Sequence, residues 1–116
     1  RLAGFINKAS DGLPPTSTCG RDTHCRLKWR RYVAAKELFH TRKTLAKTIG
    51  LKWGAYHLAR PGNPILQAQH FLRFTKPGDN DLLALDIEHN DTCRLWIRFA
   101  SGRRICNCNL ILVAHK

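Results

Sequence analysis

The 116-residue chain lacks methionine and any long apolar run, and it is poor in acidic residues. Its longest apolar run, Leu110–Ala114, has five residues, whereas a membrane-spanning helix needs about 20, so we expect no membrane span. Because no methionine is present, we expect a processed product, a fragment or a trimmed chain. At this length we expect one hydrophobic core, and two full-sized catalytic domains are excluded.

Acidic residues are outnumbered by basic ones, with 8 Asp and Glu against 20 Lys and Arg, a formal charge of +12. Such an excess favours polyanionic partners, nucleic acid first. The hydrophobic content of 43% is too high for a disordered basic tail, so we expect a folded cationic domain.

The positive charge is concentrated in one part of the chain. Residues 21–60 carry a net +9, whereas residues 79–91 hold five acids and no Lys or Arg. This asymmetry predicts a polyanion-binding surface in the first half. A generally solvated cationic surface is the alternative.

The five cysteines stand at irregular spacing, which is a poor disulfide framework. We therefore favour an intracellular reducing compartment, and leave open secretion with one bridge between Cys19 and Cys25. The cysteine and histidine spacings match no common zinc finger, so no metal and no cofactor is expected.

Composition and turn signals divide the chain into an arm and a domain. Residues 1–24, with Asp-Gly, Pro-Pro and a Thr/Ser run, predict a loosely structured arm. Residues 25–116 are expected to form a single domain, with a basic helical part at 25–61 and an antiparallel sheet at 79–116. The predicted fold class is α+β, a basic helical N-terminal half packed on a three-stranded antiparallel β-meander.

The expected elements follow from hydrophobic periodicity. A helix is predicted from Cys25 to about Phe39, with Leu27, Ala34 and Leu38 on its apolar stripe. Residues 65–75 are ambiguous between a helix and a strand. The three strands of the meander are expected at 82–88, 94–99 and 104–113.

The segment 42–61 carries Leu45-Ala46, Ile49-Gly50-Leu51 and Ala59 at a recognisable spacing. In these residues it resembles the helix-turn-helix of phage Cro-type repressors. The resemblance implies a recognition helix in the DNA major groove and phosphate contacts around it. It would direct Lys52, Trp53 and His57 toward bases, and Arg42, Lys43, Lys47 and Arg60 toward phosphates.

Two further sets of side chains extend the expected nucleic-acid surface. Phosphate contacts are expected from the basic helix, at Arg26, Lys28, Arg30 and Arg31. On the outer face of the meander, Arg94, Trp96 and Arg98 are suited to stack on unpaired bases. The alternative for this face is cross-strand pairing of its arginines with Asp86 and Glu88.

These residues lead to a first hypothesis of a non-enzymatic nucleic-acid-binding protein that uses its basic 21–60 segment. Duplex DNA read through the helix-turn-helix and structural RNA, as in a ribonucleoprotein, both remain open.

The enzymatic alternative is a small basic metal-independent ribonuclease or toxin domain, with an acidic inhibitor protein as partner. Its candidate catalytic residues are His89 and His115. The pair Asp86 and Glu88 is similar to the first metal-binding motif of some exonucleases. Only 28 residues follow Glu88, so a metal-dependent nuclease is not expected.

Overall fold

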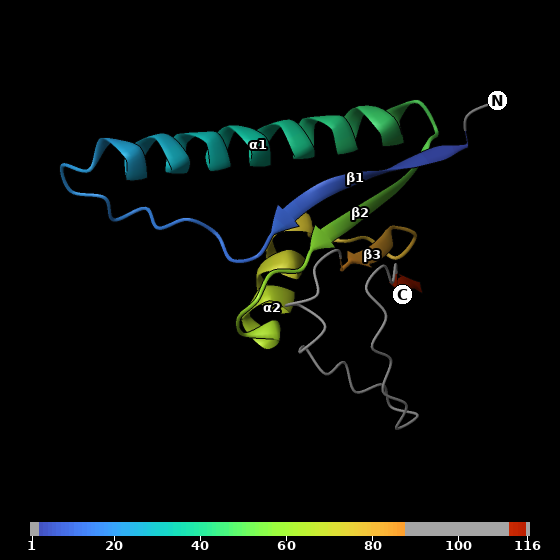
Figure 1. Cartoon of the computed structure of the whole chain (residues 1–116). Coiled ribbons are helices and arrows are strands. Elements are labelled where there is room, and N and C mark those ends of the chain that lie inside the picture. The colour runs from blue at the N-terminus through green and yellow to red at the C-terminus, as the bar shows by residue number, and fades with distance from the viewer. Residues whose placement is uncertain (1–2, 88–111, 116) are drawn as a thin grey trace, which may run out of the picture.

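The computed structural model describes residues 3–87 and 112–115. Strands and helices alternate along them (Figure 1). The elements are β1 (Gly4–Asp11), α1 (Thr23–Thr48), β2 (Lys52–Leu58), α2 (Pro64–Thr75), β3 (Leu82–Asp86) and β4 (Leu112–His115). The first three strands lie side by side in chain order and run parallel, and β4 pairs antiparallel with β3. Each parallel pair is joined by a helix, so the chain forms two consecutive βαβ units.

This topology corrects the predicted fold class. The sheet is parallel through its first three strands rather than an antiparallel meander, and a strand, not a helical half, comes first. Residues 4–11, expected in the loosely structured arm, form β1. Parallel partners such as Gly4 and Lys52 lie far apart in sequence, and no local turn signal announces their pairing. The strands expected at 94–99 and from 104 to 111 lie outside the described residues.

Both helices pack on the same face of the sheet. Phe39 of α1 and Phe74 of α2 meet with ring centroids 5.3 Å apart, and Phe39 also lies 5.3 Å from the ring of Trp53 in β2. Trp53 and Ala55, two residues apart in β2, are buried with them. Because alternate strand residues point to opposite faces, Gly54 and Tyr56 point to the face that α1 and α2 leave uncovered.

Helix α1 confirms the predicted helix over 25–39 and continues to Thr48. The Asp22 side chain accepts a hydrogen bond from the Cys25 backbone N–H at 3.1 Å and caps its start, and Gly50, with φ +79°, follows its end. The predicted apolar stripe is wrong, because Leu27 and Leu38 are 44% and 48% exposed. The inward stripe follows the same spacing on another face, as Cys25, Trp29, Tyr32, Lys36, Phe39, Lys43 and Ala46.

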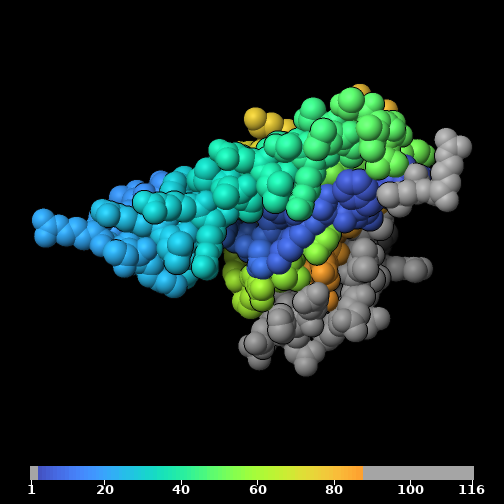
Figure 2. All heavy atoms as spheres, turned by 90° about the horizontal axis from the view of Figure 1, so that it is seen from above, coloured from blue at the N-terminus to red at the C-terminus, as the bar shows by residue number. Residues whose placement is uncertain are grey.

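The length of α1 exceeds that of the sheet. Its 26 residues span about 39 Å, whereas the eight residues of β1 span about 26 Å. The first turns of α1 therefore project past the carboxyl ends of the strands, as Figures 1 and 2 show. Neither described helix is long and apolar enough to cross a membrane.

The second helix of the expected helix-turn-helix does not form, because Lys52–Leu58 is strand β2 in the middle of the parallel strands. The ambiguous segment 65–75 belongs to helix α2. Its first turn is capped by the Asn63 side chain, which accepts hydrogen bonds from two backbone N–H groups at 3.0 and 3.1 Å.

A buried carboxylate ties α1 to the connection before β3. The side chain of Asp81, 3% exposed, lies 2.8 Å from Lys43 Nζ and 2.7 Å from Lys47 Nζ. Burial alone would raise the pKa of Asp81, but hydrogen bonds from the two ammonium groups lower it below its ordinary value. Lys43 also donates to the carbonyl oxygens of Thr75 and Lys76, at 3.2 and 2.9 Å. These lysines therefore hold the fold together.

Candidate functional site at the carboxyl edge of the sheet

The carboxyl ends of β1, β2 and β3 meet at one edge because the strands are parallel. Asp11 ends β1 and Asp86 ends β3, and both are in register with Leu58 of the strand between them. Two backbone hydrogen bonds fix this level, from Gly12 N–H to the Leu58 carbonyl at 3.0 Å and from Ala59 N–H to the Asp86 carbonyl at 2.9 Å. Two strand spacings place the Cα atoms of Asp11 and Asp86 about 10 Å apart.

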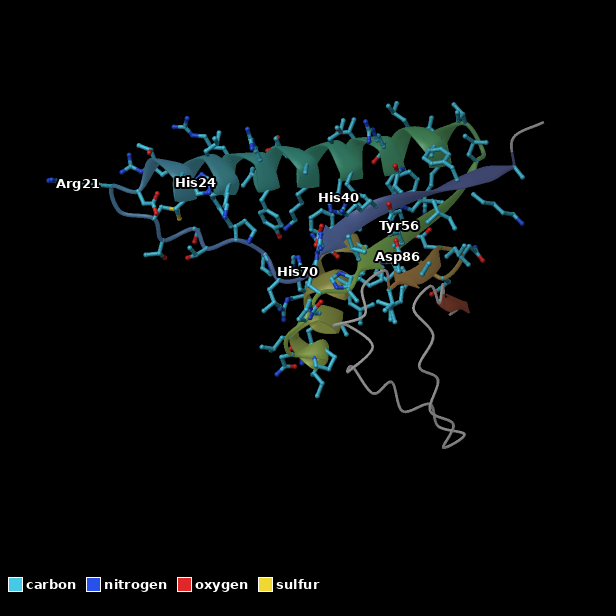
Figure 3. All side chains as sticks on the ribbon, in the orientation of Figure 1. Arg21, His24, His40, Tyr56, His70 and Asp86 are labelled. Carbon is cyan, nitrogen blue, oxygen red and sulfur yellow. A yellow bond between two sulfur atoms is a disulfide. The ribbon has the colours of Figure 1, made fainter. Side chains whose placement is uncertain are left out.

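Both aspartates belong to the sheet face that α1 and α2 leave uncovered, since they are in register with Leu58, which points the same way as Tyr56. Tyr56 lies one level further from the edge, beside Lys8 of β1. Figure 3 labels Tyr56 and Asp86 on neighbouring strands. The edge therefore carries two carboxylates, a phenol and an ammonium group on one face.

Asp11 is held in its charged form by two cations. Arg60, just after β2, donates from Nε to Oδ1 at 2.6 Å and from Nη2 to Oδ2 at 3.1 Å, and Lys8 Nζ lies 2.9 Å from Oδ2. The hydrogen bond from Arg60 is the main reason that the pKa of Asp11 falls to about 2. The carboxylate is therefore ionised at any pH above about 3.

A buried network of hydrogen bonds fixes the backbone of Arg60. The Gln67 side chain of α2 accepts from Arg60 N–H at 3.0 Å and donates to the Arg60 carbonyl at 2.8 Å, which fixes the orientation of its amide. Its Oε1 lies 3.1 Å from His57 Nε2, so that nitrogen carries the proton and Nδ1 accepts from Ser10 Oγ at 2.7 Å. Burial lowers the pKa of His57. The network joins β1, β2 and α2 beneath the edge.

The structure does not bring the sequence-predicted base contacts to a surface. Trp53 and His57 are 3% and 2% exposed, so neither reaches the base edges of a nucleic acid. Lys43 and Lys47 pair with Asp81.

Several predicted phosphate contacts are in use elsewhere or remain exposed. Arg60 pairs with Asp11, and Arg26 donates to the carbonyl of Gly20. The remaining predicted cations in the described part of the chain are exposed, namely Lys28, Arg30, Arg31, Arg42 and Lys52.

The other predicted site residues fall largely outside the described ranges. Arg94, Trp96, Arg98 and His89 lie there, and His115 is placed in β4, where its backbone is in register with Leu82. The ribonuclease hypothesis therefore stays a prediction.

Sequence reasoning missed the carboxylates at the edge. Asp11 precedes Gly12, and this pair was taken as a turn signal within an arm. Asp86 was considered only as a metal ligand and as a cross-strand partner of arginines. The strand predicted at 82–88 does end among acidic residues. This pattern points to a shared functional edge only when the neighbouring strands are known to be parallel.

No group of three His, Cys, Asp or Glu side chains within residues 3–87 and 112–115 is placed to hold a metal ion. Chemistry at this edge is therefore argued from its carboxylates and their neighbours.

These features define a class, the parallel α/β units built from consecutive βαβ motifs, whose binding and catalytic groups gather where the strands end. Comparison of the chain with protein-family models, curated proteins and solved structures gives no match.

Proposed function

We propose that this chain carries a hydrolytic site for glycosidic bonds at the carboxyl edge of its parallel strands. The observation that carries the proposal is the placement of Asp11 and Asp86 at one level of one sheet face, with a strand between them. Paired carboxylates on opposite sides of the scissile bond are the usual machinery of glycoside hydrolysis.

The separation of the two aspartates decides between carboxylate mechanisms. An aspartic-protease dyad shares one proton between oxygens in direct contact, and two side chains separated by a whole strand do not reach that geometry. Glycosidases instead leave about 5 to 9.5 Å between their carboxyl groups, so that the sugar or a water fits between. Carboxyl groups on strands about 10 Å apart can approach each other to a separation within that range.

The surroundings assign different roles to the two carboxylates. Arg60 and Lys8 keep Asp11 ionised, which suits a base, a nucleophile or a stabiliser of developing positive charge. Asp86, the other carboxylate at this level of the edge, is assigned to proton donation. Glu88 follows two positions later in the sequence, outside the described residues, and belongs in the same test.

The test measures release of reducing ends from a panel of oligosaccharides and polysaccharides by the full chain. We expect turnover that falls at least 100-fold in Asp11→Asn and Asp86→Asn, the size of effect typical of a lost acid or base. Asp79→Asn, at an exposed site in the connection before β3, is the matched control and keeps full activity. Wild-type turnover that persists in both edge variants and in Glu88→Gln would refute the proposal.

A second candidate function is the binding of nucleic acid by the exposed cations of α1. It is favoured by the charge of the helix, since residues 23–48 carry eight Lys and Arg against one Glu. Lys28, Arg30, Arg31 and Arg42 are exposed. Unlike the helix-turn-helix hypothesis, this function needs no recognition helix, because α1 contacts only phosphates and does not read bases.

Salt dependence tests the second candidate. With about four phosphate contacts, log K against log salt is expected to slope near −4 for duplex DNA. The double variant Arg30→Ala, Arg42→Ala should flatten that slope by about 2 units. A slope shallower than −2 for the wild-type chain would exclude phosphate binding by α1.

A further inference from the structure

The projecting first half of α1 forms an open cavity of about 1170 Å³ with the carboxyl edge of β1, the connection 12–22 and α2. This volume is somewhat above the range of about 300 to 1,000 Å³ for small-molecule sites, because the cavity is open on one side. The cavity lies where α1 projects past the strand ends, and its wall includes Lys8, Asp11 and Arg60 of the carboxyl edge described above. Figure 3 labels two residues of its wall, His24 on α1 and His70 on α2.

Two cations line the α1 side of this cavity. Lys28 and Arg31 both contribute to its wall, and they are three positions apart in the helix, so their side chains leave α1 on one face, about 5 to 6 Å apart at Cβ. Neither forms an ion pair or a hydrogen bond with any residue in the described ranges. By contrast, the acids of the wall are already engaged, Asp11 with Arg60 and Asp22 as the cap of α1.

The inner wall is aromatic. Tyr32 of α1 meets His70 and Phe74 of α2, each with ring centroids 6.0 Å apart, and all three side chains line the cavity. An anion would thus meet an ammonium and a guanidinium group near the opening and ring faces behind them. Arg favours planar, bidentate contact with carboxylate or phosphate oxygens.

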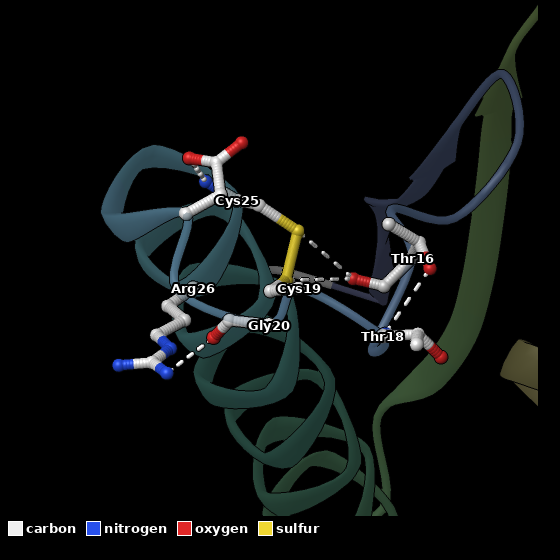
Figure 4. Close-up of a disulfide and its surroundings, with 7 residues drawn as sticks. Thr16, Thr18, Cys19, Gly20, Cys25 and Arg26 are labelled. Atoms are coloured by element: carbon white, nitrogen blue, oxygen red, sulfur yellow. Dashed lines mark hydrogen bonds between the residues drawn. A yellow bond between two sulfur atoms is a disulfide. The ribbon is translucent and has the colours of Figure 1, made fainter.

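A disulfide keeps the cavity wall in place. Cys19 in the connection and Cys25 in the first turn of α1 are bonded, with Cα atoms 5.4 Å apart (Figure 4). The carbonyl oxygen of Thr16, another wall residue, lies 3.5 Å from Cys19 Sγ and 3.8 Å from Cys25 Sγ. The connection is therefore tied to the helix on which the two cations stand, and the site is formed before a ligand arrives.

From this arrangement we propose that the cavity binds a small ring-bearing anion, a phosphate monoester or carboxylate attached to a planar ring, with Arg31 and Lys28 on the anion and Tyr32 on the ring. The proposal does not rest on glycoside cleavage, because it needs neither Asp86 nor turnover. It also differs from nucleic-acid binding by α1, since its ligand is a small molecule whose ring is recognised.

The experiment is a calorimetric titration of the full chain with p-nitrophenyl phosphate at low ionic strength. We expect one saturable site, and a Kd at least 10-fold higher in Arg31→Ala and in Lys28→Ala. The matched control is Arg30→Ala, a neighbouring exposed arginine of α1 outside the cavity wall, whose Kd should change less than twofold. Circular dichroism verifies that each variant is folded.

Titrations with inorganic phosphate and with p-nitrophenol measure separately how the anion and the ring of the ligand contribute to binding. Tyr32→Leu is expected to weaken p-nitrophenyl phosphate at least fivefold while leaving the Kd of inorganic phosphate within twofold. Equal losses in Arg30→Ala and Arg31→Ala would mean that only diffuse surface charge attracts the ligand, and would overturn the proposal. So would the absence of saturable binding, or p-nitrophenol binding as tightly as its phosphate ester.

Discussion

Gly12 sits at the point where β1 ends beside Arg60. Its φ is +58°, in the left-handed region, and a Cβ atom there would lie 3.0 Å from Arg60 Cγ and 3.2 Å from Arg60 Cβ. Only glycine avoids both the backbone strain and the contact. Arg60 can therefore approach Asp11 closely enough for its two-point hydrogen bonding.

Substitution of Gly12 is predicted to cost more than its backbone angle alone explains. Gly12→Ala should lower the free energy of unfolding by about 2 to 3 kcal/mol, the sum of left-handed strain and displacement of Arg60. Gly20→Ala is the control, because Gly20 has φ +53° but open space around it, so its cost should stay near 1 kcal/mol. Urea denaturation measures both, and equal costs would contradict the steric part of this account.

Two buried histidines, His57 and His70, and the half-buried His40 make the stability depend on pH. Burial is the main cause that lowers the pKa of His40, His57 and His70 below the ordinary value of 6.5. The unfolded chain therefore takes up protons at these positions at a higher pH than the folded chain does. Stability is complete above about pH 7 and is lost as the pH falls through 6.5 and below.

We predict that the free energy of unfolding falls between pH 7.5 and 5.5, by about 1 kcal/mol for each histidine that stays neutral in the fold. Between pH 7.5 and 8.5 these histidines contribute no change. His57→Gln should reduce the decrease, since one of the groups is gone. Urea titrations at the three pH values measure this, and a stability that rises on acidification would refute it.

At the scale of elements, the attachment of α1 depends on one carboxylate as well as on the aromatic core. The Asp81 carboxylate forms ion pairs with Lys43 and Lys47 from the last turns of α1. It also accepts a hydrogen bond from the backbone N–H of Gly78 at 2.9 Å. The side chain of Lys43 is only 15% exposed. Removal of the carboxylate would leave that ammonium group buried without its counter-charge, which is the costly way to break an ion pair.

Asp81→Asn is accordingly predicted to destabilise the fold by about 3 kcal/mol, seen as a lower midpoint in urea. Asp79→Asn, exposed in the same connection, should change stability by less than about 0.5 kcal/mol. If the two variants unfold at the same urea concentration, α1 is held by its apolar contacts alone.

The same ion cluster explains why the inward face of α1 was predicted wrongly. The stripe through Leu27 and Leu38 was chosen because apolar residues recur there. The true stripe contains Lys36 and Lys43 at inward positions, and Lys43 is accommodated by Asp81, a residue 38 positions later. Hydrophobic periodicity does not register a lysine whose partner is distant in sequence.

At the scale of the whole molecule, local signals predicted elements better than their arrangement. The helix from Cys25 and a strand beginning at Leu82 are confirmed. β2 was taken for the second helix of a helix-turn-helix, because the segment 42–61 resembles that motif in its spacing of small and apolar residues. Gly54 is required there by the sheet, since a Cβ would lie 2.9 Å from Ile6 Cγ1.

The candidate site was unpredictable for the same reason. Asp11 and Asp86 lie 75 positions apart, and only the parallel register through Leu58 brings them to one level. Basic residues are conspicuous in composition, so they dominated the prediction, although Lys43, Lys47 and Arg60 turned out to pair with acids.

The disulfide acts at the scale of the whole molecule because it joins the connection after β1 to the first turn of α1. Replacing Cys19 and Cys25 by Ser is predicted to lower stability by about 2 kcal/mol, the loop-closure value for so short a ring. Thermal unfolding with and without reductant measures it. Reductant should lower the Tm of the wild-type chain and leave that of the double variant unchanged; a Tm of the wild-type chain that ignores reductant would contradict the prediction.

The position of β1 at one edge of the described sheet has a consequence for biosynthesis. Its partner β2 follows 48 positions later, from Gly4 to Lys52, so β1 leaves the ribosome well before β2 exists to receive it. Until then Phe5 and Ile6, still 36% and 45% exposed after folding, are open to association with other nascent chains. β1 therefore stays unpaired until β2 is synthesised, and the speed of translation across α1 sets the length of that interval.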